Sequence, residues 1–149
     1  MLDEVLKIRP YYAWALLMRA VRMLQANDPG HAKKTLNFAV QVIPHHVPTL
    51  MARGSLYVSG KNYFKGIKDL EEVIRLEPEF APPYAVRGQV RELRGETQKA
   101  LEDYDRVLSL KPGHLGVLVR RAMIRARLEM KGAIDDLDRV LQARPEFIV

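Results

Sequence analysis

Acidic side chains recur in three clusters of a kind that could do acid–base chemistry. The segments DLEE, EDYD and DDLD occupy residues 69–72, 102–105 and 135–138. Paired carboxylates can act as general acid and general base, but catalysis requires one distinctive site. Because these clusters recur at a regular spacing, they are better explained as the solvated surface of a repeated helix. We therefore expect no catalytic residue and no enzymatic activity.

The remaining candidates for chemistry are weak. His31, His45, His46 and His114 fall at expected turns and lack the spacing of a metal site. The chain has no cysteine, which excludes disulfides and thiolate-bound metals. It also lacks a glycine-rich phosphate loop, a nucleophile motif and an RNA-binding signature. We expect no cofactor and no metal.

Proline follows an apolar helical segment at a fixed interval. Successive spacings are 34, 34, 34 and 33 residues for Pro10, Pro44, Pro78, Pro112 and Pro145. A proline inside a helix costs roughly 3 kcal/mol but is tolerated in the first turn, so each one is expected to end a helix. A fixed period of this length indicates a repeat array.

Alignment on the prolines produces columns of similar residues. Two columns are small: Ala20, Gly54, Gly88 and Ala122, then Ala32, Gly66, Ala100 and Ala133. Two further columns are mainly apolar: Leu36, Leu70, Tyr104 and Leu137, then Ala39, Val73, Val107 and Val140. Steps of three and four residues place these columns on one helical face, and small residues allow two helices to approach closely.

The columns resemble the tetratricopeptide repeat, a helix–turn–helix unit, over nearly the whole chain. The resemblance implies an all-α fold, an α-solenoid of antiparallel helix pairs in a right-handed superhelix. We expect one array over 1–149, with a second-helix half repeat at 1–12 and full repeats at 13–46, 47–80, 81–114 and 115–148. First helices are expected at about 13–26, 47–59, 81–94 and 115–128, second helices at about 30–43, 63–76, 97–110 and 131–143, and the half-repeat helix at 2–8.

An arginine column departs from the usual family pattern, which has leucine before the first small residue. Its members are Arg19, Arg53, Arg87 and Arg121. Burial of an unpaired charge is costly, so these side chains need partners. The second helices offer Asp69, Asp103 and Asp136, whereas the first repeat has Thr35 instead. We predict an Arg–Asp pair within each of the last three repeats and a more exposed or differently paired Arg19. The alternative is a basic ladder for an acidic ligand.

The resemblance also implies a concave groove lined by first helices. Its expected lining is mostly apolar: Trp14, Leu17, Met18, Val21, Met51, Ser55, Val86, Gln89, Val119, Arg120 and Met123. Such a lining suits an apolar peptide or an amphipathic helix. Trp14 is either a binding hot spot or buried against the half-repeat helix. The positions that match a chaperone-binding carboxylate clamp hold Leu17, Val21, Ala52, Pro82 and Val86. A frame moved one repeat onward recovers only Arg120, so clamp binding is not expected.

The leading hypothesis is a non-enzymatic protein-interaction scaffold, a fragment of a longer protein whose native N-terminus has been removed. One alternative is a homo-oligomer formed through uncapped ends. Another is binding of nucleic acid or an acidic ligand, which the net charge of +6 allows and which would use Arg91, Arg94, Arg120, Arg125 and Arg127. This alternative is disfavoured because acidic and basic residues are mixed. No membrane segment is expected; the compartment is left open, with a soluble, cytoplasmic chain favoured.

Overall fold

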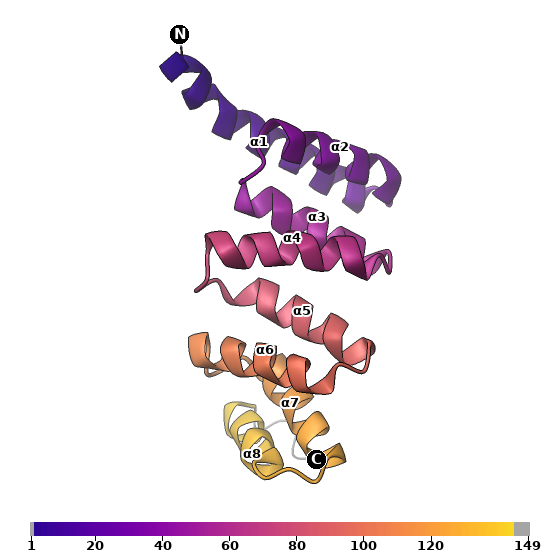
Figure 1. Cartoon of the computed structure of the whole chain (residues 1–149), viewed down its shortest axis with the longest axis vertical. Helices are drawn as coiled ribbons and strands as arrows, with labels where there is room; N and C mark the ends of the chain where they lie inside the picture. Colours follow the sequence, from indigo (N-terminus) through magenta and orange to yellow (C-terminus); the bar gives the residue numbers. More distant parts are fainter. Residues whose placement is uncertain (1, 145–149) are drawn as a thin grey trace. The chain divides into compact units, whose positions relative to one another are not determined.

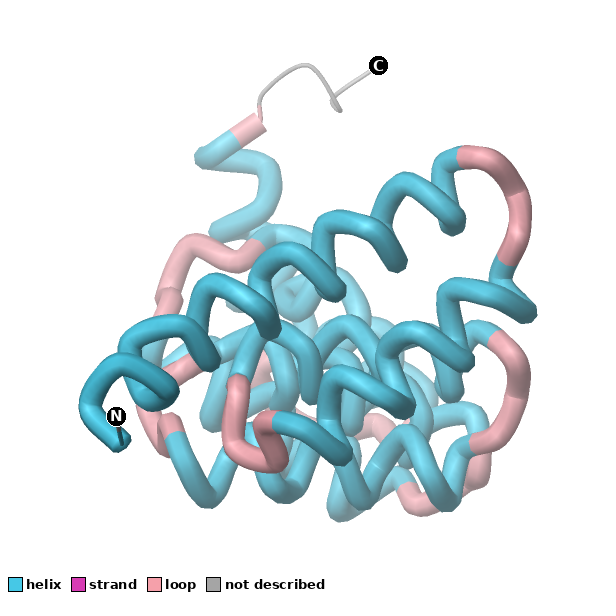
Figure 2. The backbone as a smooth tube through the Cα atoms, turned by 90° about the horizontal axis from the view of Figure 1, so that it is seen from above, coloured by secondary structure: helices cyan, strands magenta, loops and turns pink. Residues whose placement is uncertain are grey.

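Between residues 2 and 144, the fold is built from eight helices joined by short turns. A computed structural model describes the backbone of residues 2–144 and the side chains of residues 11–144, and no strand occurs in this part of the chain (Figures 1 and 2). The helices are α1 (Leu2–Gln25), α2 (Pro29–Val42), α3 (Val47–Ser59), α4 (Tyr63–Leu76), α5 (Ala81–Leu93), α6 (Thr97–Leu110), α7 (Leu115–Arg127) and α8 (Ala133–Ala143). The predicted all-α helical-repeat fold is confirmed.

Local sequence accounts for where several helices begin. The side chain of Asp28 accepts a hydrogen bond from the backbone N–H of His31 at 3.1 Å and caps α2. Asn62 caps α4 in the same way, through the backbone N–H of Lys65 at 3.3 Å. Prolines occupy the first turn of α2, α3 and α5, where the missing N–H would have had no helical partner.

The expected helix break at Pro10 is wrong. The backbone stays helical through this residue, so α1 is one helix rather than a half-repeat helix followed by a first helix. An internal proline removes one hydrogen bond and can kink a helix without ending it, and here no turn signal follows it. Residues 2–8 lie along the same helix as Trp14. The alternative in which Trp14 is buried against a separate half-repeat helix is therefore also wrong.

The chain divides between Pro78 and Glu79 into two compact units. In the first unit, α1 packs on α2 and α3 on α4, and α3 also contacts α1 and α2. In the second unit, α5 packs on α6, α6 on α7, and α7 on α8. Each unit thus contains two antiparallel helix pairs (Figure 1). The division into repeats, and their continuity as one array, stay predictions.

Small residues lie where paired helices approach most closely. Ala20, Gly54, Gly88 and Ala122 are all buried, as the first small column predicts. A Cβ atom placed on Gly88 would lie only 2.6 Å from Cε1 of Tyr104. One placed on Gly66 would lie 2.7 Å from Cγ2 of Val58. The columns therefore set the distance between the two helices of a pair.

The large apolar column is buried in three of its four positions. Leu36, Leu70 and Tyr104 are fully enclosed, but Leu137 on α8 is 42% exposed. The exposure follows from position, because no described helix comes after α8 to cover that face. Within the described residues, no helix combines the length and the apolar character that crossing a bilayer requires.

Candidate interaction surface

The predicted Arg–Asp pairs form in all three repeats that carry them. Nη2 of Arg53 lies 2.7 Å from Oδ1 of Asp69, and Nε of Arg53 lies 2.7 Å from Oδ2. The matching Nη2–Oδ1 distances are 2.7 Å for Arg87–Asp103 and 2.6 Å for Arg121–Asp136. All three carboxylates are buried. These hydrogen bonds raise the pKa of Arg53 and of Arg121 further, so both guanidiniums stay charged.

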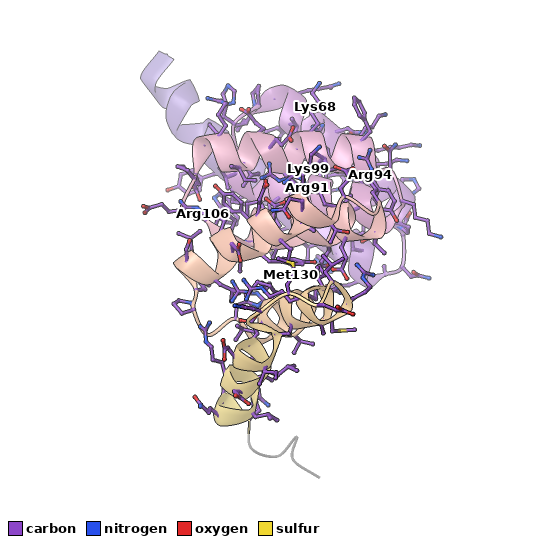
Figure 3. All side chains as sticks on the ribbon, turned by 60° about the horizontal axis from the view of Figure 1, so that its bottom comes forward. Lys68, Arg91, Arg94, Lys99, Arg106 and Met130 are labelled. Carbon is purple, nitrogen blue, oxygen red and sulfur yellow. The ribbon has the colours of Figure 1, made fainter. Side chains whose placement is uncertain are left out.

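A second arginine joins the pair in the last two repeats. Nη1 of Arg91 lies 2.9 Å from Oδ2 of Asp103, and Nη1 of Arg125 lies 3.0 Å from Oδ2 of Asp136. Arg91 also reaches the backbone carbonyl of Lys99, and Figure 3 shows the two residues side by side. The sequence left the role of Arg91 and Arg125 open. Each shares a buried carboxylate with the arginine four residues earlier. The four-residue spacing, which places both arginines on one helical face, was the sequence feature that could have predicted this sharing.

Two arginines of the column, Arg53 and Arg121, also reach the neighbouring repeat. Nη1 of Arg53 donates to Oδ1 of Asn37 on α2 at 3.4 Å, and Nη1 of Arg121 donates to Oδ1 of Asp105 on α6 at 2.6 Å. Each acceptor lies 16 residues before its arginine. In both arginines, Nε and Nη2 bind the aspartate of the same repeat, while Nη1 binds a residue of the preceding repeat.

These contacts remove most of the proposed basic surface. Four of its five arginines are in ion pairs: Arg91, Arg94, Arg120 and Arg125. Arg91 and Arg125, which are partly buried, are held by hydrogen bonds inside a repeat and cannot turn outward without taking a hydrogen bond from a buried carboxylate. The arginine column is therefore structural at Arg53, Arg87 and Arg121, and the basic-ladder interpretation loses its main support.

Arg120 belongs to a polar cluster that joins three helices of the second unit. The Tyr104 hydroxyl on α6 donates to Oε2 of Glu92 on α5 at 2.7 Å, and Nη1 of Arg120 on α7 donates to the same oxygen at 3.2 Å. Burial, together with the hydrogen bond to Glu92, raises the pKa of Tyr104 above its ordinary value of 10.0. Tyr104 is therefore a neutral donor in the folded chain.

The raised pKa of Tyr104 predicts a loss of stability at alkaline pH. Above pH 10.0 the unfolded chain releases this proton while the folded chain retains it, so the free energy of unfolding falls as pH rises. We expect Tyr104→Phe to flatten this fall in urea unfolding between about pH 9 and pH 11. Tyr12→Phe, at an exposed position, is the control and should leave the slope unchanged. Equal slopes for wild type and Tyr104→Phe would contradict the assignment.

The groove residues of the first unit separate into exposed and buried positions. On α1, Trp14 and Met18 are 50% and 55% exposed, whereas Leu17 packs in the core with Ala20, Ala32 and Leu36. Val21 is partly buried against the same core. On α3, Met51 and Ser55 are partly buried. Leu17 is therefore unavailable to a partner, because it lies three residues before Ala20 on the face that meets α2.

The Trp14 ring lies against a histidine in the turn between α2 and α3. Its centroid is 5.2 Å from that of His46, with the rings at 84° to one another. Burial lowers the pKa of His46, so the imidazole is uncharged near neutral pH. Nδ1 of His46 lies 2.7 Å from the Thr49 hydroxyl, which fixes the ring at the start of α3. Trp14 is thus supported on one side and open to solvent on the other.

In the second unit, the expected groove positions lie on α5 and α7. Val86, Gln89, Val119 and Arg120 are partly buried, and Met123 is 65% exposed. Met123 is the most accessible apolar side chain of this set. No cluster of three potential metal ligands was found among the described residues.

No protein-family model matches the sequence, and no curated protein is detectably similar to it. Solved structures do match in fold. The crystal structure of MamA superposes with a TM-score of 0.82 at 22% sequence identity, over 97% of this chain and 85% of that one. A tetratricopeptide repeat protein from Parabacteroides merdae also gives a TM-score of 0.82, at 20% identity, over 89% of this chain and 54% of that one.

The chain has the tetratricopeptide-repeat (TPR) fold. The fold predicted from the columns is confirmed. The first TPR domain of Spaghetti (RPAP3), solved bound to the HSP90 peptide SRMEEVD, matches with a TM-score of 0.73 at 20% identity. It covers 78% of this chain and 93% of that domain. At these identities the likeness establishes the TPR fold and not a shared partner.

Proposed function

We propose that the chain is a non-enzymatic scaffold that binds an apolar peptide or an amphipathic helix along its first helices. The observation that carries this proposal is the exposure of Trp14 and Met18 on α1, beside the uncharged His46. A large aromatic ring held rigidly and left half open is typical of a binding hot spot, and methionine adapts to varied apolar partners. The proposed groove in this unit consists of Trp14, Met18, Val21, Met51 and Ser55.

The second unit contributes a similar set to the proposal. It consists of Val86, Gln89, Val119, Arg120 and Met123, with Met123 as its apolar anchor. Arg120 is already paired with Glu92, so we assign it to the polar rim and not to the capture of an anion.

A carboxylate clamp is not part of the proposal. The TPR domain of Spaghetti was solved with the HSP90 peptide SRMEEVD, which makes this peptide a useful probe. In this chain, the positions at which a clamp would need cations include Val21, Ala52, Pro82 and Val86. We therefore expect SRMEEVD to bind weakly or not at all, and a synthetic amphipathic helical peptide to bind more tightly.

Replacement of two groove residues of the first unit, Trp14 and Met51, tests the proposal. Trp14→Ala combined with Met51→Ala should weaken binding of the amphipathic peptide by at least about tenfold, because both side chains bury apolar area on binding. Isothermal titration calorimetry measures the affinity, and urea unfolding measures the stability of the same variant. In the wild type, the fluorescence of Trp14, the chain's one tryptophan, should also change on binding.

Phe64→Ala is the matched control. Phe64 is an exposed aromatic residue on the second helix α4, outside the proposed groove, so its removal should leave affinity unchanged. The proposal fails if the double variant binds as tightly as wild type. A sharp loss of stability with unchanged affinity would instead assign Trp14 and Met51 to the core.

A further inference from the structure

The last helix exposes a face that is buried one repeat earlier. Ile134 and Leu137 on α8 are 72% and 42% exposed, whereas the matching Leu101 and Tyr104 on α6 are 4% and 0% exposed. In the earlier repeat, α7 packs against α6, and Arg121 of α7 donates to Asp105, which lies four residues after Leu101 on α6. No described helix follows α8 to form the matching contact. We call this surface the α8 end face; it comprises Ile134, Leu137, Asp138 and Leu141.

On α1, the residues that match the α7 side of the α6–α7 contact are exposed. On α7, Val117 and Ile124 are buried, and Arg121 reaches Asp105 of the preceding repeat. The matching residues on α1 are exposed and border an open hollow of about 570 Å³. This surface, the α1 end face, comprises Ala15, Arg19, Arg22 and Ala26.

The charges on the two end faces match a contact already present inside the chain. Asp138 occupies the position in its repeat that Asp105 and Asn37 occupy in theirs, and both of those accept a hydrogen bond from the next arginine of the column. Arg19 is the first member of the arginine column in the sequence. Among residues 11–144, neither Arg19 nor Asp138 forms an ion pair.

The first repeat also lacks the acid that would neutralise Arg19 internally. Thr35 replaces the aspartate, and Met23 replaces the second arginine of the later repeats. The Thr35 hydroxyl donates to the sulfur of Met23 at 3.5 Å. The two helices of the first repeat are therefore not joined by an Arg–Asp pair. The guanidinium of Arg19 remains exposed and available to a partner from another chain.

We propose that two copies of this chain associate head to tail, with the α1 end face of one copy on the α8 end face of the other. Arg19 then pairs with Asp138 of the second copy, as Arg121 pairs with Asp105 within one chain. Arg22 adds positive charge to one face, while Arg139, the one basic residue of α8, is bound to the Pro112 carbonyl. Such a contact is heterologous, so further copies can add to either end.

Sedimentation velocity over a dilution series tests the proposal with two charge reversals. The wild-type chain should show a mean mass that rises with concentration. Arg19→Asp and Asp138→Arg should each raise the dissociation constant at least about thirtyfold, since each places like charges at the contact. Ile134→Asp, at a highly exposed position, removes apolar area from the same face and should act in the same direction.

Mixing the two charge-reversed chains makes the test specific for a head-to-tail contact. The α8 end face is intact in Arg19→Asp and the α1 end face is intact in Asp138→Arg, so an equimolar mixture should associate again. Glu102→Arg, the same charge change on an exposed position of α6, is the control and should associate like wild type. Thermal unfolding followed by circular dichroism verifies that each variant is folded.

Three results would each overturn the proposal. The first is a wild-type chain that stays monomeric at every concentration, which would leave the α8 end face to a different occupant. The second is Asp138→Arg associating as strongly as wild type. The third is a mixture of the two charge-reversed chains that stays monomeric.

Discussion

Asp103→Asn is expected to lower the free energy of unfolding by about 3 kcal/mol. The carboxylate of Asp103 is buried and holds Arg87 and Arg91, with Nη2–Oδ1 and Nη1–Oδ2 distances of 2.7 and 2.9 Å. An asparagine keeps the shape but removes the negative charge, and its NH₂ group cannot accept a hydrogen bond. Two largely buried guanidiniums would then lose the counter-charge of Asp103. Urea unfolding followed by circular dichroism measures the loss.

Two further substitutions show whether the effect comes from this ion-pair cluster. Glu102→Gln, one residue away and exposed, should change the free energy of unfolding by less than about 0.5 kcal/mol. Asp69→Asn should cost less than Asp103→Asn, because Asp69 pairs with Arg53 alone among the described residues. A loss below about 1 kcal/mol for Asp103→Asn would mean that water replaces the carboxylate without difficulty.

Gly88→Ala should destabilise the chain by about 1–2 kcal/mol. The new Cβ atom would lie 2.6 Å from Cε1 and 2.9 Å from Cδ1 of Tyr104. The ring cannot move aside freely, because it is fully buried and its hydroxyl is bound to Glu92. Both contacts are below 3.0 Å, so the overpacking cost is expected at about 2–3 kcal/mol, which exceeds the gain of about 1 kcal/mol that alanine brings to a helix over glycine. The midpoint of urea unfolding should fall accordingly.

Two controls distinguish the clash with Tyr104 from a general effect of the substitution. Gly113→Ala should be nearly neutral, since beyond its two neighbours in the chain no heavy atom lies within 4 Å of its Cβ position. Gly88→Ala combined with Tyr104→Leu should recover part of the loss, because leucine fills this position in the first two repeats as Leu36 and Leu70. A Gly88→Ala chain as stable as wild type would show that the α5–α6 pair can separate without cost.

Much of the secondary structure could be predicted because turn and small-residue signals repeat. The expected bounds of α3, α4 and α6 coincide with those observed, and those of α2, α5 and α7 differ by one residue at one or both ends. The Arg–Asp pairs could also be predicted, because a column of buried charge requires a matching column of opposite charge. Pro10 misled the prediction, since one proline does not by itself end a helix that has no turn signal after it.

Exposure at the candidate groove could not be predicted from the repeat columns. Leu17 and Met18 are neighbours in the sequence, yet one packs against α2 and the other faces solvent. A shift of one residue on a helix turns a side chain by about 100°, so a small error in the assumed helix orientation moves a residue between groove and core. The degree to which Trp14 is exposed depends on the same helix orientation.

The sequence by itself determined the period, the helix pairs and the presence of paired arginines and aspartates, because each of these follows from local propensity or from charge that must be neutralised within a repeat. Only the tertiary structure decided how each charge is shared. Asp103 and Asp136 each bind two arginines, Arg121 also reaches the preceding repeat, and Arg19 is left open at the start of the array. The reason is geometric: a guanidinium offers donors in several directions, and the packing angle of neighbouring helices selects which acceptors lie within reach.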